Sequence, residues 1–171
     1  MAEGPTIPAT ICDFRPEDQA ACAALYQDGL IGGRIADNDT GLDIYDIEHT
    51  YMKPAGNHFW VAKSLDNQVV GMIGVQHYDE GVGEIRRLRV RQDHRRRGIG
   101  HALVETAVRF CQQQNYLKVT LDTFMEREPA LRLFEKFHFR LYTTRELSGK
   151  ELVYFFLDLY AGEERPRHQP Q

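Results

Sequence analysis

The apolar and polar positions of the chain alternate with two periods, which predict a mixture of strands and helices. A run of β-branched and apolar residues at 9–14 predicts a first strand. Pro16, followed by two acidic residues, opens a helix that is expected to extend to Leu30. A second helix is expected over 42–51, capped by the polar loop 37–40.

Three strands follow in close order. They are expected at 57–64, 68–77 and 84–91, with turns at 65–67 and 80–83 between them. Because turns this short join antiparallel neighbours, these strands predict a meander.

The second half of the chain alternates helices with strands. Helices are expected at 98–114 and 129–137, and strands at 119–122, 139–146 and 151–159. The first of these helices has an apolar face at helical spacing. The order of elements predicts an α/β (α+β) fold, with a single mixed, mostly antiparallel sheet flanked by helices.

Composition narrows the class of protein. The 171 residues suffice for one domain, predicted at 1–160, and the polar tail 161–171 is expected to be flexible. No apolar run approaches the roughly 20 residues that cross a bilayer, and no signal peptide is visible, so no membrane partner is expected. Three widely spaced cysteines favour reduced thiols and a cytoplasmic location. No histidine has metal-ligand spacing, so no metal is expected.

Charge is distributed unevenly along a chain whose net charge is −4. Acidic residues dominate 1–60, whereas seven arginines lie between 86 and 97 beside a single acid, Asp93. A basic cluster in an acidic chain indicates a specific anionic ligand, whereas a nucleic-acid binder would be more basic overall. No nucleic-acid partner is therefore expected.

The loop Arg95-Arg96-Arg97-Gly98-Ile99-Gly100 joins the third meander strand to a helix. The first N–H groups of a helix lack partners and carry a partial positive charge, and glycines let the backbone approach an anion closely. The loop therefore predicts a phosphate site. It has neither the Gly-Lys-Ser/Thr ending of a P-loop nor the dinucleotide-binding fingerprint.

The sequence Arg95-x-x-Gly98-x-Gly100 resembles the Arg/Gln-x-x-Gly-x-Gly/Ala motif of the GCN5-related N-acetyltransferase (GNAT) superfamily. The resemblance extends to Leu88–Val90 before the loop and to 121–123 and 130–139 after it, and covers roughly residues 8–160. It implies the acyl-CoA N-acyltransferase fold and an enzyme that uses acetyl-CoA as cosubstrate, with no metal.

The resemblance also implies roles for individual residues. Backbone amides of Arg95, Arg96, Arg97, Gly98, Ile99 and Gly100 would hold the CoA pyrophosphate, and Arg96 or Arg97 would reach a CoA phosphate. The strand through Leu88, Arg89 and Val90 would splay from strand 119–122, and pantetheine would pair with the main chain in the gap. The Val90 amide would polarise the thioester carbonyl.

N-acetylation needs a neutral amine, and deprotonating a lysine-like amine at pH 7 costs about 4.6 kcal/mol. Glu84 lies six residues before Val90, the spacing at which lysine-acetylating members of the superfamily carry their general base. Glu84 is therefore the candidate catalytic residue, expected to share a strand face with Arg86 and Leu88. The alternative is a structural pair with an arginine, which would keep the pKa of Glu84 low.

Three positions depart from the family pattern. Phe134 stands where a tyrosine often acts as general acid, His138 where glycine is common, and Arg127 where asparagine is frequent. Water, Tyr142 or Tyr154 would then have to protonate the leaving thiolate. The departures keep open a second interpretation, a CoA-binding regulatory module with little or no catalysis.

The acceptor is expected to be a primary amine of a small molecule, or a lysine or N-terminus of a peptide. Acidic residues near the second helix would form a wall that favours a cationic amine, or simply a solvated helix face: Asp37, Asp39, Asp43, Asp46 and Glu48. Domains of this family often pair through their C-terminal strands, so the resemblance also makes a homodimer an open expectation.

Overall fold

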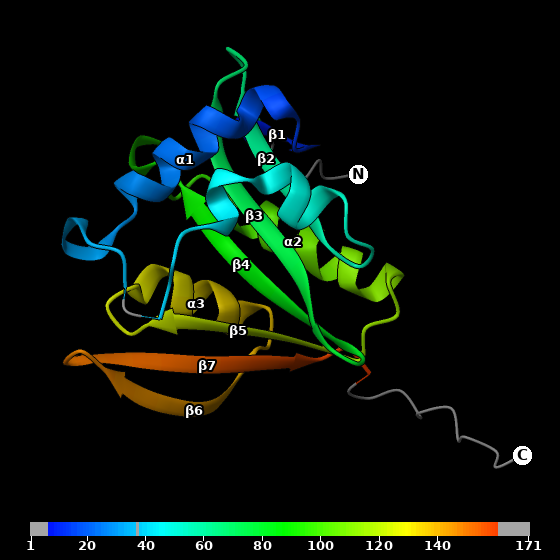
Figure 1. The fold of residues 1–171 in the computed structure, drawn as a ribbon, viewed down its shortest axis with the longest axis vertical. Coiled ribbons are helices and arrows are strands. Elements are labelled where there is room, and N and C mark those ends of the chain that lie inside the picture. The colour runs from blue at the N-terminus through cyan, green and yellow to red at the C-terminus, as the bar shows by residue number, and fades with distance from the viewer. Residues whose placement is uncertain (1–6, 37, 161–171) are drawn as a thin grey trace, which may run out of the picture.

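The computed structural model describes residues 7–36 and 38–160; the predicted tail 161–171 lies outside the described residues. Within them, seven strands form one sheet in the order β1-β2-β3-β4-β5-β7-β6 (Figure 1). Neighbouring strands run antiparallel except β4 and β5, which are parallel. The predicted mixed, mostly antiparallel sheet is confirmed.

The bounds of the elements follow the predicted order. The strands are β1 (Ala9–Asp13), β2 (His58–Ser64), β3 (Val69–Asp79), β4 (Val82–Val90), β5 (Lys118–Phe124), β6 (Arg140–Leu147) and β7 (Lys150–Asp158). The α-helices are α1 (Gln19–Asp28), α2 (Ile99–Gln113) and α3 (Glu128–Lys136). Short 3-10 turns are η1 (Pro16–Asp18), η2 (Ile31–Gly33), η3 (Asp43–Tyr45) and η5 (Gln92–His94), and η4 (Glu48–Met52) is a π-helical turn. In the described part of the chain, no helix is long and apolar enough to span a membrane.

The prediction of one continuous helix over 42–51 is wrong. The segment consists of η3 and η4, which are separated at Asp46, where φ of −147° and ψ of 63° leave the helical region. The Asp46 carboxylate accepts a hydrogen bond from the His49 N–H at 3.3 Å, and such local bonds compete with the helical ladder. Ile44, Ile47 and Tyr51 of the segment are nevertheless fully buried, whereas Leu42 and Tyr45 are exposed.

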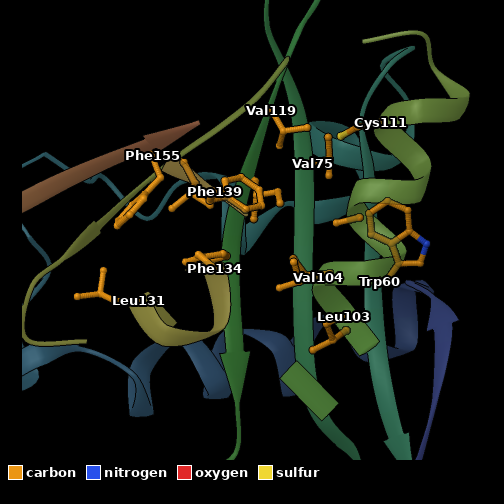
Figure 2. Packing of buried hydrophobic residues seen from close by; sticks show 14 of the residues in the cluster. Trp60, Val75, Leu103, Val104, Cys111, Val119, Leu131, Phe134, Phe139 and Phe155 are labelled. Carbon is orange, nitrogen blue, oxygen red and sulfur yellow. The ribbon is translucent and has the colours of Figure 1, made fainter. Parts of the chain in front are cut away.

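Two hydrophobic clusters cover opposite faces of the sheet. Alternation along β2 sends Phe59 into the cluster under α1, η3 and η4, and Trp60 into the cluster under α2 and α3. Figure 2 shows the second cluster, which extends from Trp60 and Leu103 beside α2 to Phe134 in α3. Phe59, Trp60 and Cys111 are all buried.

Candidate active site

The sheet opens between β4 and β5. Their parallel pairing covers one end only, from Val82 opposite Lys118 to Glu84 opposite Thr120. Beyond that point β4 stays with β3, while β5 pairs along its whole length with β7. The two strands diverge (Figure 1), as the resemblance implied. A cleft of about 840 Å³ lies at the divergence, lined by β4, β5, α3 and parts of the segment that follows α1.

A β-bulge in β4 decides on which face of the sheet its side chains lie. The register against β3 shifts between Arg86 and Arg89, and Arg87 adopts a φ of 59°. Glu84 and Arg86 remain on one face, with 3.5 Å between Arg86 Nε and Glu84 Oε1. Leu88 packs instead against the hydrophobic cluster under α2. The expected common face is therefore wrong for Leu88, because the extra residue of the bulge shifts the alternation.

The predicted phosphate loop has the backbone that an anion site needs. Gly98 is the N-cap of α2 and has a φ of 83°, the left-handed conformation that glycine tolerates. Ala102 N–H donates to the Gly98 carbonyl at 3.0 Å as the first step of the helical ladder. The N–H groups of Ile99, Gly100 and His101 precede that step, and they carry the partial positive charge of the helix end.

The other loop residues support this backbone in different ways. The Ile99 side chain is buried in the core, so the loop offers a ligand only the main chain at that position. Arg95 Nε donates to the Val90 carbonyl at 3.0 Å, which ties the loop to the end of β4. Arg96 and Arg97 are exposed beside the helix N-terminus.

The end of β4 presents a backbone donor to the cleft side. Arg91 N–H donates to the Val70 carbonyl at 2.8 Å, toward β3. Because successive N–H groups of a strand point to opposite edges, the Val90 N–H points to the edge that β5 has left. That edge can accept an extended ligand chain as an additional strand.

Glu84 is a largely buried carboxylate, with 19% of its side chain exposed. Burial raises its pKa, Arg86 opposes this effect, and the carboxylate of Asp122 adds to it. The expectation that an arginine would keep the pKa low is wrong, because desolvation outweighs an attraction over 3.5 Å. A carboxylate with a raised pKa is a stronger base once ionised.

Asp122 of β5 is a second cleft carboxylate, which the sequence reasoning missed. It lies two residues after Thr120, the partner of Glu84, and burial raises its pKa while Arg86 opposes the rise. Asn38 Nδ2 donates to Asp122 Oδ2 at 3.4 Å. The segment containing Asp122 carries the family resemblance, but only strand pairing reveals that it lies near Glu84.

Neither interpretation of the acids near the predicted second helix holds for Asp39 and Asp43, because Arg87 binds both. Arg87 Nη1 lies 2.6 Å from Asp39 Oδ2, and Arg87 Nε lies 2.9 Å from Asp43 Oδ2. The Tyr26 and Tyr51 hydroxyls donate to Asp39 and Asp43 at 3.1 and 2.5 Å. This group, which we call the Arg87 clamp (Arg87, Asp39 and Asp43), leaves neither acid free to attract a cationic amine.

Of the remaining acids, Asp46 lies 2.7 Å from His49 Nδ1, and Asp37 lies outside the described residues. His138 has a φ of 66°, which explains why glycine is common at this position in the family.

No tyrosine replaces Phe134 as a proton donor among the residues that the structure describes in the cleft lining. Phe134 is buried in the core beneath the cleft. Tyr142 on β6 is 75% exposed, and neither it nor Tyr154 lines the cleft. Tyr26 does line it, but its hydroxyl already donates to Asp39.

Comparisons with known proteins agree with the features of this cleft. The model of the acetyltransferase (GNAT) family matches residues 14–139. A zebrafish protein named N-acetylaspartate synthetase is 40% identical over 99 residues, which is 57% of this chain and 35% of that protein. Human N-acetyltransferase 8 is 37% identical over 103 residues, which is 57% of this chain and 45% of that protein. The chain thus spans less than half the length of these relatives.

Solved structures share the fold. A GNAT-family acetyltransferase from Staphylococcus aureus Mu50 has a TM-score of 0.76 and 20% identity, over 88% of this chain and 99% of that one. Ard1 from Thermoplasma volcanium has a TM-score of 0.74 and 22% identity, over 89% and 98%. The divergent strands, the glycine-capped helix N-terminus and the family match over residues 14–139 agree: this chain belongs to the acetyltransferase (GNAT) family.

Proposed function

We propose that this protein transfers an acetyl group from acetyl-CoA to a primary amine by direct attack, without a covalent enzyme intermediate. The observation that carries the proposal is the opening of β4 from β5 beside the glycine-capped N-terminus of α2. A helix end of this kind suits a pyrophosphate, and a free strand edge suits the amide-bearing pantetheine chain.

The residues of the chain offer a suitable group for each part of acetyl-CoA. The N–H groups of Ile99 and Gly100 would hold the pyrophosphate, with Arg96 and Arg97 as additional cations. When bound, acetyl-CoA supplies an activated acyl group. The Val90 N–H would donate to the thioester oxygen and stabilise the negative charge that develops there.

Glu84 would accept the proton of the attacking amine. The amine nitrogen forms a bond to the acetyl carbon, the carbon–sulfur bond breaks, and water protonates the thiolate, whose free pKa is about 8.5. Asp122 would raise the basicity of Glu84 by its charge, consistent with its effect on the pKa of Glu84.

The relatives favour catalysis over the CoA-binding module, because both are named as enzymes. Since one is named N-acetylaspartate synthetase, amino acids belong in an acceptor panel for this chain. We also propose a cytoplasmic location, which the free cysteines Cys12, Cys22 and Cys111 support. Recovery of the tagged chain with membranes after cell fractionation would contradict it.

The test is thiol release from acetyl-CoA across amino acids, polyamines and lysine peptides, with Gly98→Asp and Gly98→Asn as matched variants. Both place a side chain at a φ of 83°, but only the aspartate adds a negative charge at the pyrophosphate site. We expect Gly98→Asp to raise the KM for acetyl-CoA well above that of Gly98→Asn.

Two outcomes would contradict the proposal. Tight CoA binding without thiol release on any amine would favour the binding module. A wild-type protein that neither binds CoA nor releases thiol would exclude the acetyltransferase.

A further inference from the structure

The cleft between β4 and β5 has a surplus of cations. Its lining contains Arg34, Arg86, Arg87, Arg89, Arg127 and Lys150, against the carboxylates Asp39, Glu84 and Asp122. Ion pairs within the protein engage Arg86, Arg87 and Lys150. Over residues 7–36 and 38–160, the other three arginines form no ion pair. A cleft with such a surplus favours an anionic ligand, although the chain as a whole is acidic.

Two of the unpaired guanidinium groups meet at Gly29, the C-cap residue that follows α1. Arg127 Nη2 donates to the Gly29 carbonyl at 2.6 Å. Arg89 packs so closely that a Cβ on Gly29 would lie 2.6 Å from its Nε. Glycine at this position therefore makes room for the Arg89 guanidinium, and two like charges lie against one residue.

The Arg89 side chain is also short of acceptors. Its Nη1 donates to the Leu88 carbonyl at 2.8 Å, whereas its buried Nε has no hydrogen-bond partner among the described residues. Burial lowers the pKa of Arg89, and the neighbouring charges of Arg127 and Arg87 lower it further. An anion bound here would supply acceptors and offset the repulsion between the two guanidinium groups.

The position of Arg89 indicates whether the acceptor or the CoA molecule would carry that anion. Leu88 and Val90 pack toward the cluster under α2, the helix that begins at the phosphate loop. Arg89 lies on the other face of β4, against the end of α1. The acids that could have attracted a second ammonium group, Asp39 and Asp43, are held in the Arg87 clamp.

We propose, on the basis of the proposed acetyltransferase activity, that the acceptor is an amino acid: a primary amine whose own carboxylate is bound by Arg89, with Arg127 as the second cation. Polyamines and lysine side chains lack that carboxylate. CoA phosphates are the other source of an anion in this cleft, so the experiment separates the two.

The experiment measures kcat/KM for proteinogenic amino acids and their α-carboxamides, with putrescine as a carboxylate-free amine. Charge-assisted hydrogen bonds predict a preference for the acid over its amide of about 10- to 150-fold. Arg89→Met should reduce this ratio to about one and leave the KM for acetyl-CoA within about twofold of wild type, while Arg89→Lys should keep part of the preference. The control is Arg109→Met, which removes an exposed arginine of α2 and should keep the wild-type ratio.

Three results would overturn the inference. Equal rates on acids and amides in the wild type, or faster turnover of putrescine, would reject the carboxylate but leave the transferase intact. A raised KM for acetyl-CoA in Arg89→Met, with an unchanged acid-to-amide ratio, would assign Arg89 to the cosubstrate.

A binding measurement covers the case in which no amine is turned over. The CoA-saturated protein is titrated calorimetrically with N-acetylglycine and with N-acetylglycinamide. Tighter binding of the acid, lost in Arg89→Met, supports the carboxylate site even if the proposed activity fails; equal binding of the two overturns it.

Discussion

At the residue scale, carboxylates around one cleft have pKa values shifted in opposite directions. Burial raises the pKa of Glu84 and Asp122, and the nearby charges of Arg86 and Arg87 do not compensate. Burial acts on Asp39 and Asp43 as well, but hydrogen bonds from Arg87 outweigh it and lower both pKa values. Asp39 and Asp43 therefore stay charged because a guanidinium donates hydrogen bonds to them directly. Glu84, which receives no such bond from the residues that the structure describes, can exchange a proton.

This contrast predicts the pH dependence of the reaction. Glu84 accepts a proton only when ionised, so kcat/KM should fall as pH decreases through its raised pKa, above the ordinary value of about 4.3. Asp122→Asn should move this acid limb to lower pH, because it removes the charge that helps to raise the pKa of Glu84. Glu84→Gln should lower kcat by about 10²- to 10⁴-fold and abolish the limb.

The measurement is a pH profile of thiol release, with exposed Glu105→Gln as the control. If the acid limb of the pH profile persists unchanged in Glu84→Gln, a group other than Glu84 causes it.

At the element scale, the Arg87 clamp holds the segment that contains Asp39 and η3 against the bulge of β4. Its ion pairs are largely buried, with 6% of the Arg87 side chain exposed. Removing one partner of such a pair leaves an uncompensated charge. The clamp thus connects the bulge of β4 to the segment that forms a wall of the cleft.

We expect Arg87→Met to lower the free energy of unfolding at neutral pH by about 3 kcal/mol or more. The pKa values of Asp39 and Asp43 are lower in the folded than in the unfolded state, whose value is about 3.9. Their contribution is therefore present above about pH 4 and is lost as pH falls through the lowered values. The difference between wild type and variant should shrink accordingly.

Urea unfolding at neutral and acidic pH tests this expectation. Arg132→Met removes an exposed arginine of α3 and should cost less than about 1 kcal/mol. An equal deficit of Arg87→Met at every pH would mean that lost packing, rather than charge, causes the destabilisation.

At the scale of the whole molecule, the sheet ends in an exposed strand. Among the strands that the structure describes, β6 pairs only with β7, and its side chains from Arg140 to Glu146 are exposed, Leu141 by 58%. Such an edge offers backbone donors and acceptors to another chain. We propose that the homodimer expected from the family resemblance pairs through β6.

Light scattering after gel filtration should then give twice the monomer mass for the wild type. Leu141→Lys should give the monomer mass, since a charge on an edge strand opposes pairing. Leu65→Lys, in a turn where Leu65 is 94% exposed, is the matched control and should remain dimeric. A monomeric wild type at about 100 µM would reject this dimer.

Much of the fold was predictable, because it depends on residues close together in sequence. The period of apolar residues identified the helix from Ile99, and the short turns identified the meander from β2 to β4. Arg95-x-x-Gly98-x-Gly100 indicated an anion site at a helix N-terminus from local backbone chemistry alone. The prediction of a continuous helix over 42–51 was wrong because the Asp46 carboxylate accepts a local hydrogen bond and interrupts the helical hydrogen-bond ladder.

Only the tertiary structure decided the character of the cleft. The bulge at Arg87 redirected the side chains of β4, and strand pairing placed Asp122 near Glu84. The acids Asp39 and Asp43 became partners of Arg87 rather than a wall for a cation. Periodicity and turns reflect neighbours a few positions apart, so the sequence determines them directly. The charge state of a side chain depends on burial and on partners from distant segments, which only folding brings together.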